Sequence, residues 1–65
     1  MVRISWRGKP RYTDLPVKYM DKYMGTQTYH SLPHSEIWID DEKEAAQFVN
    51  WLKNQPAKSI KIYKG

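Results

Sequence analysis

Residues 35–64 read SEIWIDDEKEAAQFVNWLKNQPAKSIKIYK, and this stretch decides the fold. At its start, residues 35–39 alternate in the way typical of a strand, so that Ile37 and Ile39 share one face. At its end, residues 58–64 alternate in the same way. The stretch therefore begins and ends with a predicted strand.

Between the two strands lies the pattern of an amphipathic helix over about residues 42–54. Asp41 and Glu44 have the spacing of an N-terminal capping arrangement, directly before an apolar run with helical periodicity. The apolar positions of this run are Ala45, Phe48, Val49 and Leu52. Pro56 stops the helix before the last strand. A strand, a helix and a strand joined by short connections are typical of a right-handed βαβ unit.

The N-terminal half adds a strand and a second helix. Residues 2–7 alternate strictly, which predicts a strand with Trp6 in the core and a basic outer face. Residues 15–24 follow a potential capping residue, Asp14, and end at Gly25. Because both ends carry helix-boundary signals, we expect a shorter helix there.

Together these elements predict an α+β fold, or a small α/β fold, as one domain over residues 1–65. We expect a two-layer sandwich of a three- to four-stranded sheet, with helix 42–54 packed on one face and the shorter helix 15–24. The fourth strand would lie over residues 26–30, before a loop at 31–34. A core of this size buries only about 60% of the unfolded surface, and no cysteine is present to add a disulfide.

The chain shows no membrane or export signal. No apolar run approaches the roughly 20 residues of a membrane span, and the early arginines are not followed by the apolar segment of a signal peptide. The absence of cysteine suits a cytoplasmic protein. We therefore expect a cytoplasmic location and no membrane partner.

Charge is distributed unevenly along the sequence, whose net charge is +4. Residues 1–24 carry six Lys or Arg against two Asp, residues 25–46 carry five acids against one Lys, and residues 47–65 carry four Lys and no acid. If the basic ends meet in one sheet, they form a basic surface of the kind expected for a polyanion binder. The alternative is that these charges only keep a small protein soluble.

Aromatic residues are interleaved with basic ones near both ends of the chain. Cations that hold phosphates, beside rings on which unpaired bases stack, are typical of binding to RNA or other single strands. The predicted nucleic-acid contacts are Arg3, Arg7, Lys9, Arg11, Tyr12, Lys18, Tyr19, Lys22, Lys61, Tyr63 and Lys64. Duplex DNA is disfavoured because helix 42–54 begins with acids, which suit a major groove poorly. The leading hypothesis is a small, non-enzymatic nucleic-acid-binding regulator.

An alternative is a small inhibitor or accessory protein that acts on a larger protein partner. Trp38, Trp51 and Tyr23 are the candidate contacts, because aromatic residues dominate binding hot spots. Trp38 is exposed if one helix layer covers the sheet and buried if helix 15–24 covers its side. A dimer through an exposed edge strand, over 2–7 or 58–64, is also open.

Catalysis has weaker support in the sequence. His30 or His34, with Glu36 and the arginines Arg7 and Arg11, could supply the acid, base and phosphate-binding groups of a small RNase. Nothing in their spacing shows that they converge, and no phosphate-binding loop or nucleophile motif is present. The histidines and nearby acids do not form a metal-ligand pattern. We expect no enzyme activity, no metal and no cofactor.

Overall fold

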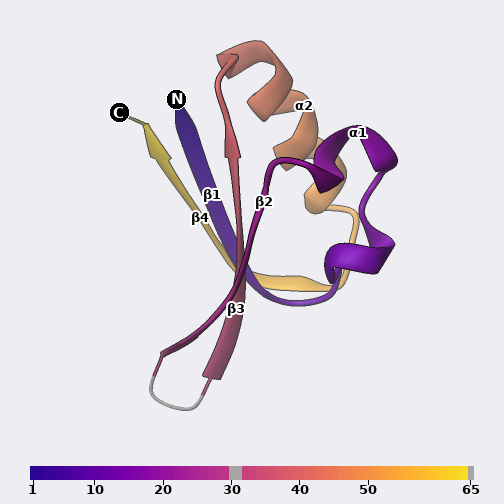
Figure 1. Cartoon of the computed structure of the whole chain (residues 1–65), viewed down its shortest axis with the longest axis vertical. Coiled ribbons are helices and arrows are strands. Elements are labelled where there is room, and N and C mark those ends of the chain that lie inside the picture. The colour runs from indigo at the N-terminus through magenta and orange to yellow at the C-terminus, as the bar shows by residue number, and fades with distance from the viewer. Residues whose placement is uncertain (30–31, 65) are drawn as a thin grey trace.

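A computed structural model describes residues 1–29 and 32–64, and within them four strands form one antiparallel sheet (Figure 1). The elements, in chain order, are β1 (Val2–Gly8), a 3-10 helix (Tyr12–Asp14), α1 (Val17–Met20), β2 (Tyr23–Tyr29), β3 (Leu32–Ile39), α2 (Glu42–Leu52) and β4 (Ala57–Lys64). The sheet has the strand order β2-β3-β1-β4. The α+β class is confirmed, with four strands.

The strand order separates each helix-linked pair of strands by one intervening strand. β1 pairs antiparallel with both β3 and β4, so β3 and β4 run parallel on either side of it, joined through α2. In the same way, β3 lies between β1 and β2, which are joined through α1. The predicted βαβ unit is therefore split by β1, and the whole chain is a β-α-β-β-α-β arrangement of two interleaved split units.

The position of β1 corrects one expectation about dimers. Residues 2–7 lie inside the sheet, hydrogen-bonded on both sides, and offer no free edge. β4 is an edge strand, so pairing through 58–64 stays a prediction. No helix among the described residues has the length and apolar character needed to span a membrane.

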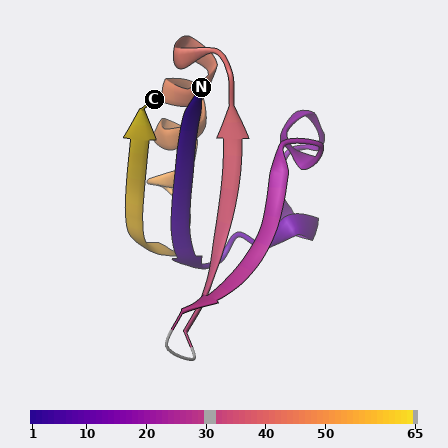
Figure 2. The ribbon, with the colours of Figure 1, turned by 60° about the vertical axis from the view of Figure 1, so that its left-hand side comes forward.

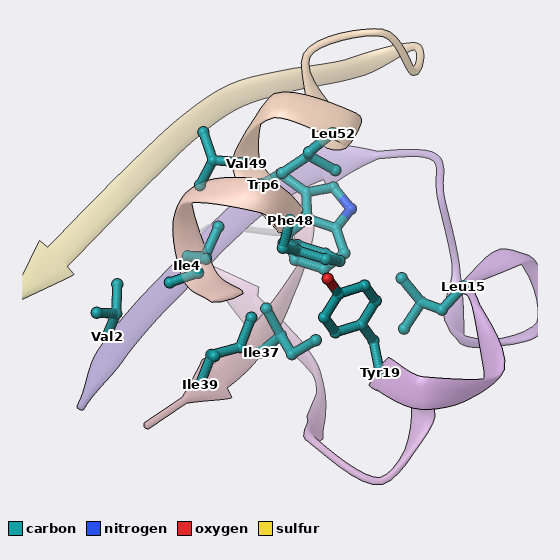
Figure 3. Packing of buried hydrophobic residues seen from close by; sticks show 11 residues of the cluster. Val2, Ile4, Trp6, Leu15, Tyr19, Ile37, Ile39, Phe48, Val49 and Leu52 are labelled. Carbon is teal, nitrogen blue, oxygen red and sulfur yellow. The ribbon is translucent and has the colours of Figure 1, made fainter. Parts of the chain in front are cut away.

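Helix α2 packs its apolar stripe onto one face of the sheet (Figures 1 and 2). The cluster that it forms with β1, β3, α1 and Leu15, just before α1, comprises Val2, Ile4, Trp6, Leu15, Tyr19, Ile37, Ile39, Ala45, Phe48, Val49 and Leu52 (Figure 3). Phe48 lies at its centre, with its ring centroid 5.7 Å from that of Trp6 and 4.8 Å from that of Tyr19. The core positions predicted for α2 are all buried.

The start of α2 follows the predicted capping pattern. The Asp41 carboxylate accepts from the backbone N–H groups of Lys43 and Glu44, at 3.4 and 3.3 Å. These two groups have no partner inside the helix, so the cap satisfies donors that are otherwise left to water. The helix ends at Leu52, two residues before the predicted end at 54.

The helix predicted over 15–24 is present but much shorter. Only Val17–Met20 is α-helical, after the 3-10 turn, and β2 already begins at Tyr23. An isolated helix of this length is marginal in water, whereas β2 is stabilised by antiparallel pairing with β3, with one irregularity between Tyr23 and Gly25. Gly25 has a φ of 104° at the irregularity in β2 instead of ending a helix.

The hairpin of β2 and β3 is also longer than predicted. β2 begins three residues before the expected strand at 26–30. β3 begins at Leu32, so most of the predicted loop at 31–34 is strand. Antiparallel pairing between β2 and β3 stabilises strand structure in residues whose sequence shows no clear periodicity.

Candidate nucleic-acid interface

The sheet has a second face, turned away from α2. Because side chains alternate along a strand and directly paired residues share a face, the cross-strand register defines this surface. We call it the open face, and it carries Arg3, Ser5, Arg7, His34, Glu36, Trp38, Lys58, Lys61 and Tyr63. Figures 1 and 2 show α2 on the other side of the sheet.

One row of the open face places a cation between two exposed aromatic side chains. Arg3 on β1 is paired with Trp38 on β3 and with Tyr63 on β4. Trp38 is 38% exposed and Tyr63 is 43% exposed. The Arg3 guanidinium carbon lies 4.2 Å from the centroid of the Tyr63 ring, which is a cation–π contact.

The carboxylate of Glu36, in the next row of the open face, lies close to both Trp38 and Arg3. Glu36 is only 6% exposed, and its Oε2 accepts a hydrogen bond of 2.6 Å from the Trp38 indole Nε1–H. Its Oε1 lies 4.0 Å from Arg3 Nε. A buried charge needs such partners to offset its loss of hydration. Because Glu36 and Trp38 are two residues apart on one strand, the indole leans along β3 toward Glu36.

The open face is hollowed between β1, β3 and β4. A groove of about 450 Å³ is lined by Arg3, Ser5, Trp6, Arg7, His34, Glu36, Ser59, Lys61 and Tyr63. Its lining has three basic side chains and one carboxylate that is already engaged by Trp38. The groove can therefore hold a small planar group next to an anion.

A bulge in β4 adds one more cation to this face. The register shifts between Ser5 and Arg7, and Ser59 takes a φ of 53° there. The extra residue changes which side chains point outward, so that Lys58 is paired with Arg7. Without the bulge Lys58 would point toward the α2 side, and only the bulge brings it to the open face.

The structure brings together four of the predicted nucleic-acid contacts, namely Arg3, Arg7, Lys61 and Tyr63. Lys64 is paired with Val2, and it lies with Lys53 beside α2 on the other face.

The remaining predicted contacts lie between β1 and β2, in the segment that contains Lys9, Arg11, Tyr12, Lys18 and Lys22. Tyr12 is exposed and packs against Tyr23, with ring centroids 5.4 Å apart. Lys18 Nζ lies 5.0 Å from the Tyr19 ring centroid, and Lys22 Nζ lies 3.7 Å from Glu44 Oε1. Lys18 and Lys22 therefore belong to the helical side of the molecule.

The expectation that Tyr19 contacts nucleic acid was wrong. Tyr19 is 3% exposed, and its ring meets Phe48 edge to face inside the core (Figure 3). Tyr19 lies on α1, which directs its ring toward α2 and the core. The prediction that Trp6 is a core residue is confirmed, and its Nε1–H donates to the Pro10 carbonyl at 2.9 Å.

The three candidate contacts for a protein partner do not form one surface. Trp38 lies on the open face, while Trp51 is half-buried on α2 with its ring centroid 5.6 Å from that of Phe48. Tyr23 is half-buried, and its hydroxyl donates to Ser35 Oγ at 3.3 Å. The structure thus leaves Trp38 next to the predicted nucleic-acid residues, as the alternation of residues 35–39 could have indicated.

The residues proposed for catalysis fall into two groups. His30 lies outside the described residues, and His34 is paired with Arg7 on the open face. Among residues 1–29 and 32–64, no three His, Asp or Glu side chains group in a way that could hold a metal ion. RNase activity stays a hypothesis that only a cleavage assay addresses.

Comparison with known proteins found no matching family model, no matching curated protein and no matching solved structure.

Proposed function

We propose that this chain is a small, non-enzymatic RNA-binding protein that holds a single strand across the open face of its sheet. In this proposal the domain is a two-layer sandwich, with the helices as one layer and the binding sheet as the other. The observation that carries it is the row in which exposed Trp38 and Tyr63 flank Arg3. An RNA ligand also fits the cytoplasmic location expected from the sequence.

The chemistry of this row suits unpaired bases. An aromatic ring offers a stacking surface to any base, and each stacked base contributes about 1–3 kcal/mol. Trp38 and Tyr63 are separated by two strand spacings, about 10 Å, which leaves room for one base on each. Exposed aromatics on a four-stranded sheet are one of the common ways in which small domains bind single-stranded RNA.

The surrounding cations suit the phosphates of the same strand. Arg7, Lys58 and Lys61 lie on the open face beside the aromatic row. Release of counterions from a neutralised phosphate backbone provides affinity that falls with salt. Helix α2 begins with Glu42 and Glu44 and buries its apolar stripe in the core, so it is a poor reader of a duplex groove.

Fluorescence anisotropy tests the proposal with a labelled uridine-rich RNA, the matching single-stranded DNA and a duplex DNA, at low and physiological salt. We expect the RNA to bind, with a logarithmic salt slope of about −0.7 for each phosphate contacted. Tyr63→Ala should weaken binding by about 5- to 150-fold, the equivalent of one stacked base. Tyr63→Phe keeps the ring and should bind almost as the wild type does.

Two further variants distinguish binding through the cations of the open face from non-specific attraction by the net positive charge. Arg7→Ala removes a cation from the open face, whereas Lys43→Ala removes an exposed cation from the first turn of α2. We expect Arg7→Ala to weaken binding and flatten the salt slope, and Lys43→Ala to do neither. Absence of RNA binding at low salt, or equal loss in both variants, contradicts the proposal and favours a protein partner.

A further inference from the structure

Arg3 is held in place without being saturated by hydrogen bonds. Its guanidinium rests on the Tyr63 ring, and its closest approach to Glu36 is 4.0 Å, which exceeds hydrogen-bond length. Among the described residues, no protein acceptor takes a hydrogen bond from the Arg3 side chain, which is 42% exposed. A guanidinium has five N–H donors in a planar fork, so donors of Arg3 remain for a ligand.

Trp38, on the neighbouring strand, is also held in one orientation. The 2.6 Å bond to Glu36 fixes its indole, and the side chain still reaches solvent. Because Arg3 and Trp38 are directly paired, their side chains start roughly 5 Å apart on one face. A base that stacks on the indole and extends toward β4 therefore brings one edge to the Arg3 fork, which rests on Tyr63.

We propose, on the basis of the RNA-binding function above, that Trp38 and Arg3 form a subsite selective for guanine. Guanine presents two acceptors, O6 and N7, on one edge, and a bidentate arginine matches them. Adenine replaces O6 with an amino donor, which faces the donors of Arg3, and cytosine likewise presents an amino donor. Uracil offers only O4 on the corresponding edge, because its second acceptor, O2, lies beyond the N3–H donor. On this edge guanine alone satisfies two donors of the fork. Unpaired cytosine has two adjacent acceptors, O2 and N3, on its Watson–Crick edge, so the preference for G over C is the decisive comparison.

The geometry gives Glu36 a positioning role in this subsite. It touches both Trp38 and Arg3 and is itself nearly covered, so it has little surface to offer a base. Its carboxylate lies between the two groups, 2.6 Å from the indole nitrogen and 4.0 Å from Arg3 Nε. Arg3 is the specificity-determining residue, and Trp38 is the stacking platform.

The test uses four labelled heptameric RNAs, uridine throughout except for G, A, C or U at the central position. Anisotropy should show that the wild type binds the G-containing probe about 5- to 150-fold more tightly than the others, as expected for one bidentate contact. Replacing the central G with 7-deazaguanine removes one acceptor and should abolish most of this preference.

Two matched substitutions locate the preference. Arg3→Lys keeps the charge but loses the planar fork, so we expect it to bind the all-uridine probe within about threefold of the wild type and to lose the preference for G. Arg7→Lys makes the same change on the same strand and face, and this variant should retain the preference for G. Circular dichroism checks that both variants are folded.

The outcomes separate this inference from the function on which it rests. Binding of all four probes with equal affinity overturns the guanine subsite and leaves RNA binding intact. Equal weakening of all four by Arg3→Lys also overturns it, because Arg3 would then be a phosphate contact. Absence of binding to every probe overturns the proposed function, and the subsite with it.

Discussion

Two tryptophans on neighbouring strands, Trp6 and Trp38, show how differently the two faces of the sheet are built. Trp6 faces α2, is fully buried against Phe48 and donates its indole N–H to a backbone carbonyl. Trp38 faces the other way, stays partly exposed and donates to the carboxylate of Glu36. Both indole N–H groups donate a hydrogen bond, but only the Trp6 ring is part of the hydrophobic core. We therefore expect the α2 face to provide the stability of the domain, and we propose that the open face binds RNA.

The largest expected effect is on the α2 face. Phe48→Ala removes a ring at the centre of the core and should lower the free energy of unfolding by about 3–5 kcal/mol. A domain of this size has a net stability of only several kcal/mol, so we expect the variant to be largely unfolded. Urea titration followed by circular dichroism measures the loss.

The matched change on the open face is Tyr63→Ala. It removes an exposed ring of similar size and should cost less than about 1 kcal/mol of stability while weakening RNA binding. A comparable loss of stability in Phe48→Ala and Tyr63→Ala would contradict the view that the α2 face, and not the open face, stabilises the domain.

Glu36 is the open-face residue expected to affect both properties. Glu36→Ala leaves the Trp38 N–H without its acceptor, and should cost about 1–3 kcal/mol of stability and free the indole. Glu36→Gln retains an acceptor oxygen but removes the negative charge, so we expect nearly wild-type stability and somewhat tighter RNA binding. Unfolding curves and anisotropy report the two effects, and equal behaviour of Ala and Gln would contradict the positioning role.

The smallest expected effect concerns the bulge in β4. Ser59 has a φ of 53°, a left-handed conformation that glycine adopts at no steric cost. Ser59→Gly should therefore raise the free energy of unfolding by up to about 1 kcal/mol without moving Lys58 from the open face. Thermal unfolding tests the gain, and a loss of stability would show that the Ser side chain matters more than the backbone.

The sequence predicted the elements whose pattern is local and strong. The alternation of β1 and the capped apolar stripe of α2 need only their own residues, and both are in the structure. The helix predicted over 15–24 is shortened to α1, because residues from Tyr23 onward belong to β2, which is stabilised by pairing with β3. Pairing between distant segments leaves no local signal.

The open face was predictable only in part. Arg3, Arg7, Lys61 and Tyr63 could be placed from alternation in the two strands that carry them. Lys58 could not, because it depends on a bulge without a glycine to mark it. Alternation along residues 35–39 places Glu36 and Trp38 on the same face of their strand. The sequence does not show whether that face is exposed, because this depends on where the helices pack.

The most direct test of the central claim is an NMR titration of the protein with uridine-rich RNA, following the three tryptophan indole N–H signals. Trp38 lies on the open face, whereas Trp6 and Trp51 pack against Phe48 on the other side. We expect RNA to shift the Trp38 signal strongly and to leave those of Trp6 and Trp51 nearly unchanged. A dominant shift at Trp51, or no shift at Trp38 under saturating RNA, would contradict it.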